Sequence, residues 1–192
     1  MVEPLSPLLP VAPSYSPTGD ASEICAETRG AAIASLHVRP DDISLGAPLP
    51  APGRMTRGET FTLISTGPCT YFAVSDGADP MFGAQLAATA AGARIADQSG
   101  AYVLMRIHGG QARAILQKGV FIDLHPDVFT PHAAALTRCG RISVVLWRAD
   151  EALEYGVAVP RSYARSFLDW FAFACRAGTV ARRRDCHRQR HL

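Results

Sequence analysis

The segment of residues 142–175 constrains the fold most, because two consecutive strand patterns in it lead directly into one amphipathic helix. Residues 142–147 are apolar on both faces, as is typical of an interior strand. Residues 152–159 alternate between larger apolar side chains and small or polar ones, which is the period of a half-buried strand. Pro160 ends this strand, and Ser162 can cap the helix that follows. We therefore expect two adjacent strands and one helix to pack as a unit.

The helix expected after Ser162 carries aromatic side chains on more than one face. Its apolar positions fall at steps of three and four, opposite charged residues; they are Tyr163, Phe167, Trp170, Phe171 and Ala174. Phe173 lies outside this stripe, and a second tryptophan, Trp147, lies in the first strand of the segment. Two interpretations remain open. Either the hydrophobic core is thick around these aromatic residues, or Phe173 and part of the helix contact a partner protein.

The rest of the chain has the pattern of short strands interleaved with single helices. We expect strands near residues 31–38, 59–66, 71–75, 94–98, 102–108 and 132–138, and helices that begin at Asp79-Pro80 and after Gly110. Proline and glycine predict a loop over residues 47–58. Residues 121–129 are expected to be irregular or a single helical turn, because Pro126 and Pro131 interrupt the segment. Strand and helix do not alternate strictly, which indicates an α+β fold with mainly antiparallel sheets.

The ends of the chain differ in composition from its middle. Residues 1–30 are rich in proline at their start and are expected to form an extended arm. Residues 31–175 are expected to form a single α+β domain, with two packed halves (31–118 and 119–175) as an alternative. Residues 176–192 contain six arginines and one aspartate, a net charge of +5, which leaves −3 for the rest of the chain. We expect this tail to be disordered and solvated, although such charge can also contact nucleic acid or an acidic partner.

Composition excludes several classes of protein. A chain of 192 residues that is 48% hydrophobic can bury a proper core. No apolar run is long enough for a membrane span, and the body is not basic enough for a nucleic-acid-binding domain. The N-terminus lacks the pattern of a signal peptide. The five cysteines include no C-x-x-C pair, which favours reduced thiols in the cytoplasm over a disulfide framework.

Two pairs of polar residues are candidates for chemistry. Asp123 and His125 would project to one side of an extended backbone, where they could form an acid–base pair or bind a metal together with His132. The alternative is a loop in which Asp123 accepts backbone hydrogen bonds. Asp97 and Ser99 could line a small-molecule pocket, or they could stabilise the chain reversal at Ser99-Gly100.

Other candidates point to structural roles. His108 precedes two glycines, but the chain contains neither a dinucleotide fingerprint nor a phosphate-binding loop. A nucleophile elbow of the form G-x-S-x-G is also missing. Cys139 and Cys175 lie in apolar segments, where burial makes a thiol inert. We therefore assign no catalytic, cofactor-binding or metal-binding residue to this chain.

The last third of the chain resembles the small gamma subunit of heterotetrameric sarcosine oxidase. The resemblance rests on two series in order, KGVFIDLHPDVF and RISVVLWRADEALEYGVAVPRSYARSFLDWFAFA. Their parts are a glycine followed by a hydrophobic pair and D-L-H-P, then a V-L-W strand, a V-P-R-S turn and an L-D-W helix. The middle third agrees more loosely, through TGPCTYFAVSDG and ARIADQSGAYVLMRIHGGQARAILQKG. The first thirty residues and the last seventeen are not covered.

A second resemblance concerns the fold. Residues 95–99 (IADQS), followed by a strand and a Gly-Gly-x-Ala-Arg helix, are similar to a strand–loop–strand of the folate-binding aminomethyltransferases of glycine cleavage. In that family an aspartate in this vicinity belongs to the active site, which here would be Asp97. The family's His-Met after the serine is replaced by Gly100 and Ala101. The resemblance therefore implies the fold and not the activity.

The two resemblances together imply a cytoplasmic, non-catalytic subunit with a role in assembly and stability. Its partners would be the alpha, beta and delta subunits, with no nucleic acid and no membrane. The complex would convert sarcosine to glycine, hydrogen peroxide and formaldehyde or 5,10-methylenetetrahydrofolate. FAD, FMN, NAD and tetrahydrofolate would be held by the other subunits. The alternatives are the equivalent subunit of another N-methyl amino acid oxidoreductase, such as N-methylglutamate dehydrogenase, or a free-standing folate-binding C1-transfer protein.

Overall fold

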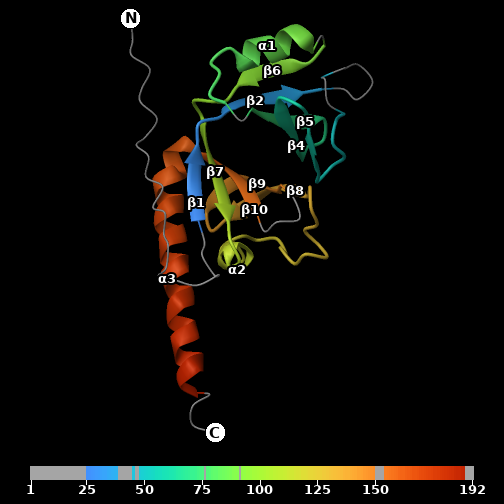
Figure 1. Cartoon of the computed structure of the whole chain (residues 1–192). Helices are drawn as coiled ribbons and strands as arrows, with labels where there is room; N and C mark the ends of the chain where they lie inside the picture. The colour runs from blue at the N-terminus through green and yellow to red at the C-terminus, as the bar shows by residue number, and fades with distance from the viewer. Residues whose placement is uncertain are drawn as a thin grey trace, which may run out of the picture.

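Two five-stranded antiparallel sheets form the centre of the molecule (Figure 1). The computed structural model describes residues 25–38, 45, 48–75, 77–90, 92–149 and 154–188. Sheet A has the strand order β1-β7-β10-β9-β8, and sheet B has the order β3-β4-β5-β2-β6. The strands of sheet A are β1 (Cys25–Arg29), β7 (Tyr102–His108), β8 (Ala134–Cys139), β9 (Ile142–Arg148) and β10 (Glu154–Pro160). Those of sheet B are β2 (Ala32–His37), β3 (Met55–Arg57), β4 (Phe61–Gly67), β5 (Thr70–Ser75) and β6 (Arg94–Asp97). All the pairings between these strands are antiparallel.

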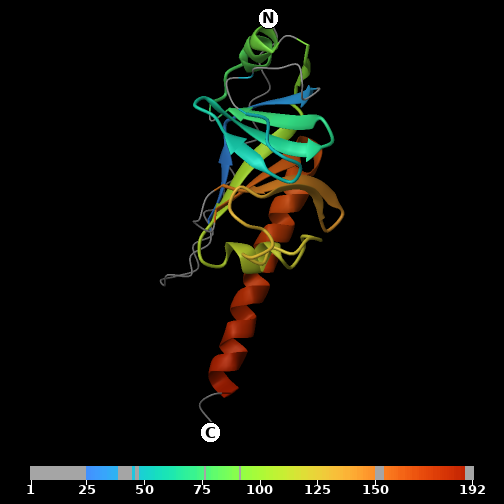
Figure 2. The ribbon, with the colours of Figure 1, turned by 90° about the vertical axis from the view of Figure 1, so that its right-hand side faces the viewer.

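Helices cover the outer faces of both sheets, so that the layers follow the order α1, sheet B, sheet A, then α2 and α3 (Figures 1 and 2). The helices are α1 (Phe82–Thr89), α2 (Ala112–Leu116) and α3 (Ala164–Arg188), and a 3₁₀ turn, η1 (Arg161–Tyr163), precedes α3. The α+β class with mainly antiparallel sheets is thus confirmed.

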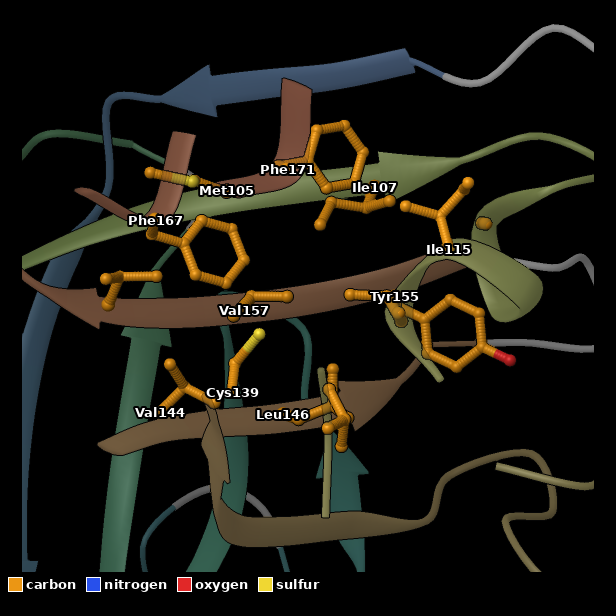
Figure 3. Close-up of a cluster of buried hydrophobic side chains, with 14 of the residues drawn as sticks. Met105, Ile107, Ile115, Cys139, Val144, Leu146, Tyr155, Val157, Phe167 and Phe171 are labelled. Atoms are coloured by element: carbon orange, nitrogen blue, oxygen red, sulfur yellow. The ribbon is translucent and has the colours of Figure 1, made fainter. Parts of the chain in front are cut away.

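Three hydrophobic clusters separate these layers. The first lies between sheet A and the helices α2 and α3 and includes Phe167, Phe171 and Tyr155 (Figure 3). The second lies between sheet B and α1. The third fills the space between the sheets, with Ile33 and Trp147 among its members. Neighbouring strand residues alternate between clusters because successive side chains point to opposite faces, so sheet A is apolar on both faces.

The chain crosses between the sheets at two short connections. Only Gly30 and Ala31 separate β1 in sheet A from β2 in sheet B. Likewise, β6 in sheet B leads through residues 98–101 into β7 in sheet A. An isolated bridge between Arg54 and Ala133 joins the β3 end of sheet B to the β8 end of sheet A. These connections hold the two sheets together at their corners.

The strand and helix expectations agree with the structure in position, with two additions to the strands. The strand β3 lies inside the expected loop of residues 47–58, and β1 lies inside the expected N-terminal arm of residues 1–30. Both form because a neighbouring edge offers backbone partners: β1 pairs with β7, and β3 pairs with β4. The rest of the arm, residues 1–24, lies outside the described residues.

The division of the chain also differs from the two halves considered above. The sheets do not separate at residue 118, because β7 comes from the first half yet pairs with β10 of the second half within sheet A. At the other end, α3 continues to Arg188, through most of the tail that we expected to be disordered. Residues 176–188 contain no proline, and alanine and arginine both favour helix. Ser162 lies within η1 rather than at the helix cap.

Two glycines allow tryptophan rings to lie directly against the backbone. A Cβ at Gly156 would lie 2.1 Å from Cε2 of Trp147, its direct partner across the β9–β10 pair. A Cβ at Gly119 would lie 2.3 Å from Cζ2 of Trp170. The two indoles belong to different clusters, Trp147 to the inter-sheet one and Trp170 to the helix side of sheet A.

Gly156→Ala is expected to lower the free energy of unfolding by about 2 kcal/mol or more, because the added methyl group displaces a buried indole. Chemical denaturation followed by tryptophan fluorescence would measure the change. Gly100→Ala is the matched control, since its Cβ would meet no atom within 4 Å. Equal stability of the two variants would contradict this account of the Trp147 packing.

Truncation after Arg176 is expected to leave the thermal unfolding midpoint of the body unchanged. Among the residues whose burial the structure describes, Cys175 is the last member of the helix-side cluster. The helix beyond it projects away from both sheets (Figure 2). Circular dichroism should show less helix but the same cooperative transition. A large drop in the midpoint would mean that residues 177–192 contribute to the core.

Candidate functional site

Hydrogen bonds within the Asp97–Ser99 turn, and between the turn and neighbouring segments, fix its conformation. The Asp97 carboxylate accepts from the Ser99 hydroxyl at 2.6 Å and from the Ser99 backbone N–H at 3.0 Å. The Ser99 hydroxyl oxygen also accepts from the backbone N–H of Ile33 at 3.0 Å. Arg161 donates to the carbonyl oxygens of Gly100 at 2.7 Å and Ser99 at 3.2 Å. The turn therefore joins β6, β7, β2 and the start of α3.

This arrangement also determines the charge of Asp97. The hydrogen bonds from the Ser99 hydroxyl and backbone lower the pKa of the Asp97 carboxyl from its ordinary value, because they favour the ionised form. A general base near neutral pH needs the opposite shift. The geometry thus favours the turn interpretation of Asp97 and Ser99 over the pocket interpretation.

Asp123 and His125 stabilise the loop after α2 in the same way. The Asp123 carboxylate accepts from the backbone N–H of His125 at 2.8 Å. The carbonyl oxygen of His125 accepts from the N–H groups of Val128 at 2.9 Å and Phe129 at 2.8 Å. The exposed His125 ring lies 3.4 Å from the Asp127 carboxylate. These contacts are local and exposed, so they order the D-L-H-P loop.

The remaining histidines do not complete a metal site. His132 has a positive φ of 64°, and its carbonyl oxygen accepts from the N–H of Met55, where β3 begins. His108 is the last residue of β7, opposite Cys25 and Glu154 in the strand register. Within the described part of the chain, no three His, Cys, Asp or Glu residues are placed to hold a metal ion together.

Cys139, at the end of β8, and Cys175, on α3, are buried thiols of the helix-side cluster. Burial raises the pKa of the Cys139 thiol to about 12. Burial likewise raises the pKa of Cys175 to about 11, and the opposing effect of Lys118 and Arg176 is smaller. Both thiols are therefore protonated at neutral pH, which agrees with the packing role expected for them.

A cleft of about 260 Å³ lies between the two sheets. Its wall contains apolar residues of the inter-sheet cluster, with charged or polar ones among them; these are Met55, Arg57, Thr62, Val74, Leu104, Met105, Arg106, Trp147, Ala149, Glu154 and Gly156. Arg106 on β7 and Glu154 on the neighbouring strand β10 form a bidentate ion pair.

The cleft and the surrounding fold do not fit a dinucleotide. The volume is below the roughly 300–1,000 Å³ of common ligand pockets. The Rossmann fold binds a dinucleotide with parallel strands and a crossover helix whose N-terminus faces the pyrophosphate, whereas every sheet pairing in the described residues is antiparallel. The charges of Arg106 and Glu154, which line the cleft, neutralise each other in their ion pair.

Sequence reasoning missed the charged residues of this region. Arg106 and Glu154 form a pair only because β7 and β10 are neighbours, although 48 residues separate them in the chain. Arg148 is buried at the end of β9 and donates to the carbonyl oxygen of Phe129 at 3.0 Å. In the sequence, Arg106 and Arg148 each stand as a single arginine in an apolar strand pattern. That pattern does not identify the group with which either arginine interacts.

The aromatic residues of α3 have two different environments. Phe167 and Phe171 are buried in the helix-side cluster (Figure 3), and Trp170 packs against its edge. Phe173, in contrast, is 64% exposed. A thick core thus accounts for most of the aromatic residues but not for Phe173.

Comparison with known proteins finds similarity in structure only. No family model matches the chain, and no curated protein sequence matches it. A chain of the heterotetrameric sarcosine oxidase from Corynebacterium sp. U-96, solved in complex with pyrrole 2-carboxylate, has a TM-score of 0.71 at 20% identity. The match covers 81% of this chain and 85% of that one.

The glycine cleavage system aminomethyltransferase T from Bartonella henselae is also similar, with a TM-score of 0.59 at 14% identity. That match covers 75% of this chain but only 44% of the transferase chain, so this protein spans less than half of it. The two similarities confirm the fold that the sequence resemblances implied. No helix in the described residues is long and apolar enough to cross a membrane.

Asp97→Ala and Ser99→Ala are each expected to lower the free energy of unfolding by about 1 kcal/mol at pH 7. Their effects should be less than additive in the double variant, because both substitutions remove the hydrogen bond from the Ser99 hydroxyl to the Asp97 carboxylate. The folded-state pKa of Asp97 is lowered, so the stabilisation by its charge is present above the unfolded pKa and is lost as pH falls. Denaturation at pH 7 and pH 3 should therefore show a smaller effect of Asp97→Ala at pH 3, and an effect that grows in acid would contradict the network.

Proposed function

We propose that this chain is the gamma subunit of a heterotetrameric sarcosine oxidase and that its role is assembly and stability. The observation that carries the proposal is the fold similarity to a chain of such an enzyme over most of both chains. The two chains are also close in length, since similar shares of each are covered. The motif series between Lys118 and Cys175 supports the same assignment.

The positions of the motif residues support a role in scaffolding. In D-L-H-P, Asp123 and His125 order a loop. In V-P-R-S, Arg161 ties the start of α3 to the β6–β7 turn. In V-L-W and L-D-W, the two tryptophans pack against glycines. The residues that carry the resemblance thus build the fold, and their polar groups are used within it.

Under this proposal the chemistry belongs to the alpha, beta and delta subunits. The complex would oxidise the N-methyl group of sarcosine, release glycine and reduce oxygen to hydrogen peroxide. The one-carbon unit would leave as formaldehyde, or be transferred to tetrahydrofolate to give 5,10-methylenetetrahydrofolate. FAD, FMN, NAD and tetrahydrofolate would lie on those subunits. The antiparallel fold and the small cleft of this chain support that assignment. The cysteine pattern, an odd number with no C-x-x-C pair, suits a reducing cytoplasm.

The transferase similarity favours one alternative, a folate-binding C1-transfer protein that uses Asp97. The equivalent subunit of another N-methyl amino acid oxidoreductase, such as N-methylglutamate dehydrogenase, is the other. The subunit of another N-methyl amino acid oxidoreductase differs from the proposed gamma subunit only in the substrate of the complex. Activity of the assembled complex on sarcosine and on N-methylglutamate would distinguish the two.

Co-expression of the tagged chain with the alpha, beta and delta subunits from the same organism tests the proposal. We expect all four to elute together in gel filtration, with flavin absorbance, while the isolated chain shows none. A control expression without this chain should give less of the assembled enzyme. Separate elution of this chain, or full assembly and activity without it, would overturn the proposal.

Titration of the isolated chain with tetrahydrofolate tests the folate alternative. Because the Asp97 carboxylate is already bonded to Ser99, we expect no heat of binding in calorimetry. Binding that Asp97→Ala abolishes and Asp123→Ala leaves intact would instead favour the C1-transfer protein.

A further inference from the structure

The β8 edge of sheet A is capped at both ends and open in the middle. At one end the backbone N–H of Ala134 donates to the carbonyl oxygen of Gly53 at 2.8 Å. At the other end the N–H of Phe121 donates to the carbonyl oxygen of Arg138 at 3.1 Å. Both bonds lie on the side of β8 away from β9. Between Ala134 and Arg138 only Leu136 has the same orientation, because alternate residues of a strand direct their backbone groups to the same side.

The Leu136 N–H and carbonyl groups therefore point out of the sheet. Opposite pairs in an antiparallel ladder alternate between those that exchange hydrogen bonds and those that do not. Leu136 and Val145 on β9 are a pair of the second kind. Neither group of Leu136 bonds to another residue in the part of the chain that the structure describes. We call the stretch from Ala134 to Arg138, with Gly53 and Phe121 at its ends, the β8 notch. It spans four strand steps, about 14 Å.

Exposed side chains adjoin the notch on the inner face of sheet A, the face that carries the inter-sheet cluster. Leu136 is 60% exposed although its cross-strand partner Val145 is buried in the inter-sheet cluster. Phe121 is 71% exposed and lies across from Arg138, which places it diagonal to Leu136 on the same face. Arg138, two residues from Leu136 on β8 and opposite Phe121, also has an exposed side chain on this face. The surface thus combines an open backbone pair, two apolar side chains and one cation.

We propose that the β8 notch binds an extended segment of a companion subunit, with an apolar residue against Leu136 and Phe121 and a carboxylate facing Arg138. This inference rests on the proposed function for the existence of the companion. Strand addition satisfies the open N–H and C=O groups, and the side chains on one face give the specificity. The positive charge of Arg138 selects the acidic residue.

The shape of the notch selects a protruding segment over a second copy of the same edge. The Gly53 and Phe121 segments stand one strand spacing, about 4.8 Å, outside β8. Two identical notches placed face to face would meet at these segments before their Leu136 backbones came within bonding distance. A single extended segment of about three residues fits between them.

Hydrogen exchange of the Leu136 amide, in the isolated chain and in the complex co-expressed with the alpha, beta and delta subunits, tests the proposal. We expect fast exchange in the isolated chain and slowing by about tenfold or more on assembly. Mass spectrometry with fragmentation, or NMR of the labelled chain, resolves this single amide.

Variants test the side chains. Arg138→Glu and Leu136→Thr are each expected to weaken assembly by about tenfold, without a change in the unfolding midpoint of the isolated chain. Threonine keeps the strand propensity of the site. The matched controls are Arg141→Glu, an exposed arginine in the β8–β9 turn, and Met81→Thr, which is 56% exposed at the start of α1. Both controls should assemble as the unchanged chain does.

The outcomes separate the two hypotheses. Assembly in which Leu136 stays unprotected and Arg138→Glu binds normally would overturn the β8 notch and leave the gamma-subunit proposal standing. No association with the three subunits would overturn both. Protection of the Leu136 amide in the isolated chain would also contradict binding of a companion subunit at the notch. Protection that depends on protein concentration would indicate self-association. Protection that is lost when residues 1–24 are deleted would indicate that a segment of this chain occupies the notch.

Discussion

The contact of Trp147 with Gly156 determines how closely the two sheets pack. The two residues are direct partners across β9 and β10, and the missing side chain at Gly156 lets the indole lie over the neighbouring backbone. The ring then fills the inter-sheet cluster beside Ile33 and also lines the cleft. A larger residue at position 156 would displace the ring from its strand, so the spacing of the layers depends on this one pair.

A similar contact fixes the other face of sheet A. Trp170 of α3 lies against Gly119, and the Cβ position of this glycine is also 3.1 Å from the sulfur of Cys139. Phe167 and Phe171 continue the same cluster over β7 and β10 (Figure 3). Sheet A is therefore buried on both faces, by sheet B on one side and by helices on the other. This double burial explains why a chain of 192 residues uses so many of its aromatic side chains in one third of its length.

The polar residues that draw attention in the sequence serve these layers. Asp97, Ser99 and Arg161 fasten the corner where the chain passes between the sheets. Asp123 and His125 order the loop that caps the β8 end. Chemistry by such groups would require them to release bonds that hold the fold together. The hydrogen bonds of these polar groups within the fold are consistent with a scaffold. The exposed side chains of Leu136 and Phe121 at the β8 edge are consistent with a partner that binds there.

The sequence by itself determined the fold class, most strands and the aromatic helix, because the period-two and 3.6-residue patterns are local and come from one stretch of chain at a time. Leu136 shows the limit of such patterns, since its apolar side chain fits a buried strand face but is exposed at the edge strand of sheet A. The Arg106–Glu154 pair, the partner of β1 and the β8 notch likewise needed the tertiary structure. Each depends on which strands become neighbours, and a contact between residues far apart in the chain leaves no periodic trace in either segment.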